Sequence, residues 1–160
     1  MSAVPEKLPV HIAGSRLDRK RHICAFFHSK EEEYRVLLPY VTEGFDHGDK
    51  AFHIVDPDHR DVHLARLREA GVDTETAAAR GQLEVMPWES AYLRGDRFDQ
   101  HAMLALIEEV LQKGSADGFP LTRLLANMEW ALQDRPGVEQ IVEYETRLNY
   151  VLPKYDDAVT

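Results

Sequence analysis

The sequence predicts an α/β domain of three layers, in which a mainly parallel sheet lies between two sets of helices. Short apolar runs such as 50–55 and 83–86 alternate with longer stretches whose apolar residues recur at helical spacing. The connections are too long for hairpins, so successive strands are expected to run parallel. A chain of 160 residues is also long enough to bury a core without disulfide bridges.

The expected elements follow one another from residue 21 onward. Residues 1–20 mix proline, charge and isolated apolar residues without a period, so a flexible lead-in is expected before a single domain over 21–160. Strands are expected at 22–27, 50–55, 83–86 and 121–128. Helices are expected at 29–48, 56–71, 74–80, 99–113 and 137–152.

The first expected helix has marked signals at both ends. Ser29 and Glu32 have the spacing of a capping box, and the acidic residues that begin at Glu31 suit the positive end of the helix dipole. Gly48 is the expected end of the helix. Pro39 lies inside the apolar pattern and predicts either a kink or a later helix start.

Charge and cysteine content exclude several classes of protein. The formal net charge is -9, which argues against a nucleic-acid-binding module because such a module needs a basic face. Cys24 is the single cysteine, so an internal disulfide is impossible and a reducing, cytoplasmic location is expected. No apolar run approaches the roughly 20 residues that span a bilayer, so no membrane association is expected.

The turn after the first expected strand does not have the composition of a phosphate-binding loop. It reads Phe27-His28-Ser29-Lys30-Glu31 and contains no glycine, whereas a phosphate loop uses glycines to bring backbone N–H groups around the anion. ATP hydrolysis is therefore not expected. Neither a nucleophile motif nor a convincing acid pair is present elsewhere, so we predict a binding protein without a cofactor rather than an enzyme.

The first expected strand carries four candidate ligand-binding residues. Alternate residues of a strand share a face, so His22, Cys24, Phe26 and His28 are expected to point the same way. Thiolate and imidazole also suit zinc, copper or iron, which leaves open a metal or haem site made of His22, Cys24 and His28. Such ligands along one strand would be about 7 Å apart, a spacing that disfavours one shared ion.

Aromatic residues after two later strands are expected to complete a pocket at the carboxyl ends of the sheet. Trp88 follows the third strand, and Glu129 and Trp130 lie at the end of the fourth. Ligands of open parallel sheets bind at these ends, in pockets with apolar walls and a few polar groups. The histidine pair His59 and His63 lacks a metalloprotease glutamate and is expected on an exposed helix face.

Several short motifs, in order, resemble those of a known family. The run 22–27 before an acidic helix is similar to the opening of the MEDS domain, a sensory domain of methanogen and methylotroph regulators. Further similarity lies at 43–45, 52–55 and 67–71, in Met128-Glu129-Trp130 and in Tyr144-Glu145-x-x-Leu148-Asn149. Together these motifs extend from Arg21 to the end of the chain, and their order makes the resemblance fairly specific.

The resemblance implies a RecA-like fold without a phosphate loop. It also implies sensing of small hydrocarbon derivatives or one-carbon compounds, ahead of a transcriptional or kinase output in a partner protein or a fused domain. His22 is then the first ligand-contacting residue to be expected, followed by Glu129. Family members continue with a further strand and helix, so this chain, which ends at Thr160, is expected to lack the last strand and the output module.

Two other functions stay open on the sequence alone. One is a metal- or haem-binding sensor that uses His22, Cys24 and His28. The other is a protein-interaction module of an anti-sigma type pathway, without a pocket for a small molecule. A homodimer is compatible with each of the three interpretations.

Overall fold

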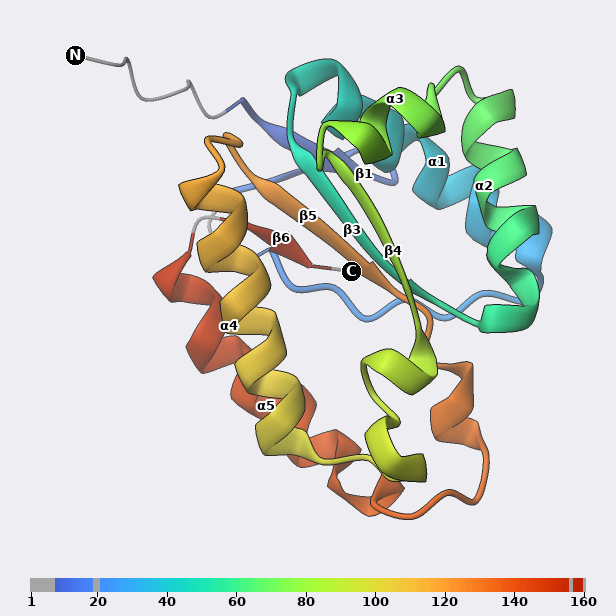
Figure 1. Ribbon diagram of the computed structural model, residues 1–160, viewed down its shortest axis with the longest axis vertical. Coiled ribbons are helices and arrows are strands. Elements are labelled where there is room, and N and C mark those ends of the chain that lie inside the picture. The colour runs from blue at the N-terminus through green and yellow to red at the C-terminus, as the bar shows by residue number, and fades with distance from the viewer. Residues whose placement is uncertain (1–7, 19–20, 156, 160) are drawn as a thin grey trace.

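The computed structural model describes residues 8–18, 21–155 and 157–159. A sheet of four parallel strands, in the order β4–β3–β5–β6, forms its centre. Figure 1 shows helices on both faces of this sheet, with α1, α2 and α3 on one side and α4 and α5 on the other. The predicted α/β class with a parallel sheet between helices is therefore confirmed.

Most of the predicted elements are present. Three predicted strands are β3 (Lys50–Val55), β4 (Leu83–Pro87) and β5 (Thr122–Ala126). The predicted helices are α1 (Lys30–His47), α2 (Arg60–Glu69), α3 (Thr74–Ala79), α4 (Gln100–Ala116) and α5 (Ile141–Val151). Ser29 caps α1 by accepting the N–H of Glu32, Gly48 ends it, and the helix runs through Pro39 without a later start.

Each face of the sheet has its own apolar core. Phe52 and Ile54 of β3 pack with α4 and α5, whereas Ala51, the residue before Phe52, packs with α1, α2 and α3. This alternation along β3 is the period of a strand that is buried on both faces. The final strand β6 (Ala158–Val159) pairs in parallel with β5 and forms the edge of the described sheet.

The predicted opening strand at 22–27 is wrong. This segment is extended but irregular: only His22 is in an isolated bridge, and Phe26 is 95% exposed. The sheet position beside β5 is taken by β6, so residues 23–28 belong to none of the strands among the described residues. Side-chain contacts with α5, described below, hold the beginning of the segment instead.

Part of the expected lead-in has regular structure. Strands β1 (Val10–Ile12) and β2 (Ser15–Leu17) form an antiparallel hairpin, whose turn has positive φ at Ala13 and Gly14. Val10 is fully buried, in the same apolar core as α1. Strands of three residues are too short to produce a detectable period, which explains why the sequence pattern did not predict them.

A buried arginine joins β5 to α1 at the amino end of the sheet. Arg123 is 2% exposed and donates to Asp49 Oδ2 at 2.8 Å, to Glu43 Oε1 at 2.9 Å and to the Tyr40 carbonyl at 2.8 Å. A Cβ on Gly44 would lie 2.7 Å from the Arg123 side chain, so the helix needs glycine here. We call Arg123, Glu43 and Asp49 the arginine cluster.

In the part of the chain that the structure describes, no helix is both long and apolar enough to cross a membrane.

Candidate ligand-binding site

The segment after β2 is attached to α5 through His22. Its Nε2 lies 3.0 Å from Glu145 Oε2, and its Nδ1 lies 3.2 Å from Asn149 Oδ1. Glu145 and Asn149 are four residues apart, so they share one face of α5. The hydrogen bond to Glu145 outweighs burial and raises the pKa of His22 above its ordinary value. The imidazole is thus bound at both nitrogens by one helix face.

Cys24 reaches the same carboxylate. Its Sγ is 3.6 Å from Glu145 Oε2, and the side chain is otherwise exposed. Partial burial raises the pKa of the Cys24 thiol, and the negative charge of Glu145 raises it further. His22, Cys24 and Glu145, which we call the His–Cys–Glu cluster, therefore bring three different donor groups together beside α5.

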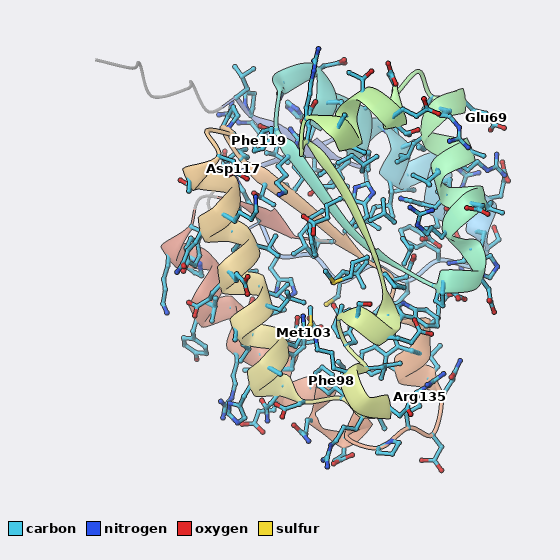
Figure 2. All side chains as sticks on the ribbon, in the orientation of Figure 1. Glu69, Phe98, Met103, Asp117, Phe119 and Arg135 are labelled. Carbon is cyan, nitrogen blue, oxygen red and sulfur yellow. The ribbon has the colours of Figure 1, made fainter. Side chains whose placement is uncertain are left out.

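An aromatic cluster lies inside the same half of the molecule. Tyr92 and Phe98 come from the loop after β4, Trp130 from the 3-10 turn after β5, and Tyr144 from α5, next to Glu145. The Trp130 ring centroid is 4.9 Å from that of Tyr92 and 5.2 Å from that of Phe98. Figure 2 shows Phe98 in the region beyond the carboxyl end of β4, below Met103.

Two polar atoms of the aromatic cluster have no hydrogen-bond partner among the described residues. They are Trp130 Nε1 and Tyr144 Oη, and both side chains are fully buried. Burial raises the pKa values of Tyr92 and Tyr144, whose neutral hydroxyls face each other without meeting the geometry of a hydrogen bond. Buried polar groups in native proteins are nearly always paired, so these two atoms mark a place where a polar partner is missing.

A second polar cluster lies at the carboxyl end of β5. Lys30, at the start of α1, contacts Glu129 Oε1 at 2.7 Å and Glu33 Oε2 at 2.9 Å, and Asn127 donates to Glu33 Oε1 at 2.7 Å. Burial disfavours the ammonium, but the hydrogen bonds to Glu129 and Glu33 outweigh it and raise the pKa of Lys30. Two carboxylates thus neutralise the lysine that a phosphate would need.

The predicted site residues fall into separate groups. His22 and Cys24 are together, and Trp88 and Trp130 belong to one apolar core, where the Trp88 indole donates to the Asn127 carbonyl at 2.9 Å. Phe26 and His28 are exposed, and Glu129 belongs instead to the polar cluster around Lys30. His28 is not among the clustered donor atoms around Cys24; Glu145 is.

The prediction of an exposed histidine pair on α2 is wrong for His63. Its Nε2 lies 2.8 Å from Nδ1 of the buried His53 on β3, and its Nδ1 lies 3.1 Å from the Tyr34 hydroxyl. Burial lowers the pKa of His63 to about 4 and that of His53 well below its usual value. His59 is exposed, as predicted, because it lies at the start of α2 and faces Asp56.

Sequence reasoning did not assign Glu145, Asn149 or Tyr144 to a site. The motif Tyr144-Glu145-x-x-Leu148-Asn149 did contain a usable signal, because Tyr144 and Leu148 form the buried stripe of α5 while Glu145 and Asn149 lie beside it. Nothing in the local pattern indicated that this face meets residues more than a hundred positions earlier.

Comparisons with known proteins place the chain among known sequences. A model of the family described as "MEthanogen/methylotroph, DcmR Sensory domain" matches residues 21–160. The chain is 28% identical over 150 residues to the "Transcriptional repressor DcmR" of Methylorubrum extorquens (strain DSM 6343 / CIP 106787 / DM4). The match covers 94% of this chain but 54% of the repressor, so the chain spans about half of that relative's length. No solved structure matches.

Proposed function

We propose, since the chain belongs to the family of methanogen/methylotroph, DcmR sensory domains, that it binds a small hydrocarbon derivative or one-carbon compound. The domain has a regulatory sensory role and is not an enzyme. The proposed output is transcriptional or kinase control, through a partner protein or a fused domain. A RecA-like arrangement of the strands and a cytoplasmic location stay predictions from the sequence.

One observation carries the choice of site: inside an aromatic cluster, Trp130 Nε1 and Tyr144 Oη have no hydrogen bond to any residue that the structure describes. Leaving a buried donor unpaired costs roughly 1–3 kcal/mol, which a ligand oxygen would recover. The chemistry of these side chains suits a molecule of a few heavy atoms, with one oxygen and an apolar body. It does not suit a charged ligand, because the aromatic cluster offers neither a cation nor an anion as a partner.

The other predicted residues differ in how near they lie to the proposed site. His22 and Cys24 lie near the cluster, since the Glu145 that holds them follows Tyr144 on α5. Trp88 packs in the same apolar core. Contacts of the ligand with Phe26, His28 and Glu129 stay predictions.

The helix α5 is the element through which we propose that binding is signalled. Its inner side carries Tyr144 of the aromatic cluster, whereas Val142 and Tyr150 on its outer side are 74% and 76% exposed. A ligand that binds one orientation of α5 more tightly would shift the population of that orientation. The exposed apolar residues of α5 would report this shift to the output partner.

The proposal is tested with a panel of one- to four-carbon alcohols, ketones and haloalkanes, followed by isothermal titration calorimetry and thermal unfolding. Oxygen-containing members should raise Tm. Trp130→Phe and Tyr144→Phe should each weaken the best binder roughly 5- to 10-fold, because each removes one hydrogen bond. Tyr150→Phe, on the same helix but exposed, should leave the affinity unchanged.

Magnesium ATP should not raise Tm, because Glu129 and Glu33 already neutralise Lys30. An unchanged affinity in both aromatic variants would contradict the proposed site. Failure of the entire panel, together with a Tm increase on adding a regulatory protein partner, would favour the interaction module instead.

A further inference from the structure

We propose that His22, Cys24 and Glu145 form a binding site for one divalent transition-metal ion, with zinc as the best fit. Each residue offers one ligand atom, and these atoms all lie within 4.8 Å of one another. Imidazole, thiolate and carboxylate are the three ligand types that zinc takes in proteins. The site replaces His28, the third ligand considered from the sequence, with Glu145 of α5.

Two of the three donor-atom spacings are close to those of tetrahedral zinc coordination. Zinc bonds of ordinary length at tetrahedral angles separate neighbouring ligand atoms by roughly 3.4–3.6 Å. Cys24 Sγ lies 3.6 Å from Glu145 Oε2, and His22 Nε2 lies 3.0 Å from the same oxygen. These two pairs need adjustments of only a few tenths of an ångström to hold an ion, and the third pair, Cys24 Sγ and the His22 ring nitrogen, lies within 4.8 Å.

Asn149 orients the histidine for this role. Its Oδ1 lies 3.2 Å from His22 Nδ1 and accepts the proton carried there, so Nε2, which donates to Glu145 without an ion, is the nitrogen that an ion would take. Metal-binding histidines usually donate their second ring N–H to a carbonyl or carboxylate oxygen in this way. Asn149 is thus a positioning residue, one helical turn from the carboxylate ligand.

Charge and exposure also suit an ion with an open coordination position. A neutral His22, a Cys24 thiolate and the Glu145 carboxylate carry two negative charges, which a divalent cation offsets. On binding, the ion takes the place of any proton on His22 Nε2 and of the thiol proton, and both protons pass to water. Cys24 is exposed, so a water or a small external ligand can take the fourth position.

This inference does not depend on the proposed organic ligand, since the aromatic cluster supplies none of the three donor atoms. The test uses purified, tag-free protein with a phosphine reductant, titrated with cobalt(II) as a spectroscopic substitute for zinc. Because Cys24 is the single cysteine, a thiolate-to-cobalt charge-transfer band identifies the site without ambiguity. The expected result is one equivalent of cobalt, with that band, displaced by zinc.

Four variants define the ligands. Cys24→Ser should abolish the charge-transfer band, and His22→Ala or Glu145→Gln should weaken zinc binding by 100-fold or more in competition with a chromophoric chelator. Asn149→Ala should weaken it by roughly 10- to 100-fold. His28→Ala is the matched control and should bind like the wild type, because its ring is outside the cluster.

Circular dichroism of each variant without metal separates lost binding from lost folding. Cys24→Ser is the decisive variant, since an exposed cysteine contributes little to the core. Cobalt binding without a charge-transfer band, or equal zinc affinity of the wild type and Cys24→Ser, would overturn the proposal. Binding of zinc with no loss in Tyr144→Phe would distinguish this site from the organic ligand site.

Discussion

Two buried polar regions of this domain differ in how completely their hydrogen bonds are satisfied. At the amino end of the sheet, Arg123 donates to two carboxylates and a backbone carbonyl. In the aromatic cluster beside α5, Trp130 and Tyr144 are equally buried, yet Trp130 Nε1 and Tyr144 Oη are without partners among the described residues. A satisfied buried cluster stabilises the fold, whereas we propose that the unsatisfied one receives a ligand.

The largest expected effect is the loss of the arginine cluster. Arg123→Met leaves Asp49 buried without its partner and should lower the free energy of unfolding by about 3–5 kcal/mol. Urea denaturation followed by circular dichroism measures this loss. Arg147→Met, which removes an exposed pair with Glu143, should change stability by less than about 1 kcal/mol. If both variants change the free energy of unfolding by the same small amount, the arginine cluster does not stabilise the fold as described.

The next largest expected effect is the loss of stability in acid that comes from the buried His53 and His63. Burial disfavours the charged form of both rings, so protonation of either one favours the unfolded chain. The pKa of His63 is about 4 in the folded protein and near 6.5 when unfolded, so the unfolded chain binds more protons between these values. The contribution of the neutral His63 to the free energy of unfolding is fully present above pH 6.5 and is lost as the pH falls towards 4. The shift corresponds to about 3 kcal/mol for His63.

Urea denaturation at pH 7, 5.5 and 4.5 checks this expectation. His63→Gln should make the acid-induced loss of stability smaller, since it removes the titrating ring. His59→Gln, at the exposed histidine of the same region, should keep the wild-type slope. A wild-type slope in His63→Gln would show that the pair does not cause the pH dependence.

The smallest effect compares a paired tyrosine hydroxyl with an unpaired one. Tyr34→Phe removes the hydroxyl 3.1 Å from His63 Nδ1 and should destabilise the fold by about 1 kcal/mol. Tyr144→Phe removes an unpaired buried hydroxyl and should leave stability unchanged or raise it by up to about 1 kcal/mol. If Tyr144→Phe is the more destabilising, the hydroxyl has a structural partner and the comparison fails.

Local signals in the sequence predicted the helices well. Ser29 and Gly48 act on the backbone of their own helix, so both ends of α1 could be located without knowledge of the tertiary structure. The segment 22–27 has the composition of a strand, but strand formation requires a neighbour, and β6 occupies the place beside β5. Its failure as a strand is thus a tertiary effect.

The same distinction explains what was predicted of the site. His22 and Cys24 were selected for alternation along a strand, and they do lie together, but because Glu145 holds both of them. Glu145 is 121 residues away from Cys24 in the sequence, and such a contact leaves no local pattern. His63 was misplaced for the same reason, since its burial depends on His53 in another element.

The indole N–H resonances in a ¹H–¹⁵N correlation spectrum test the central claim most directly, because the chain has two tryptophans. Trp88 Nε1 already donates to the Asn127 carbonyl, whereas Trp130 Nε1 has no acceptor within the described part of the chain. On titration with the best-binding alcohol or ketone of the panel, the Trp130 signal should move downfield in a saturable way while the Trp88 signal stays nearly fixed. A bound compound that leaves the Trp130 signal in place would contradict the assignment of the ligand site to the aromatic cluster.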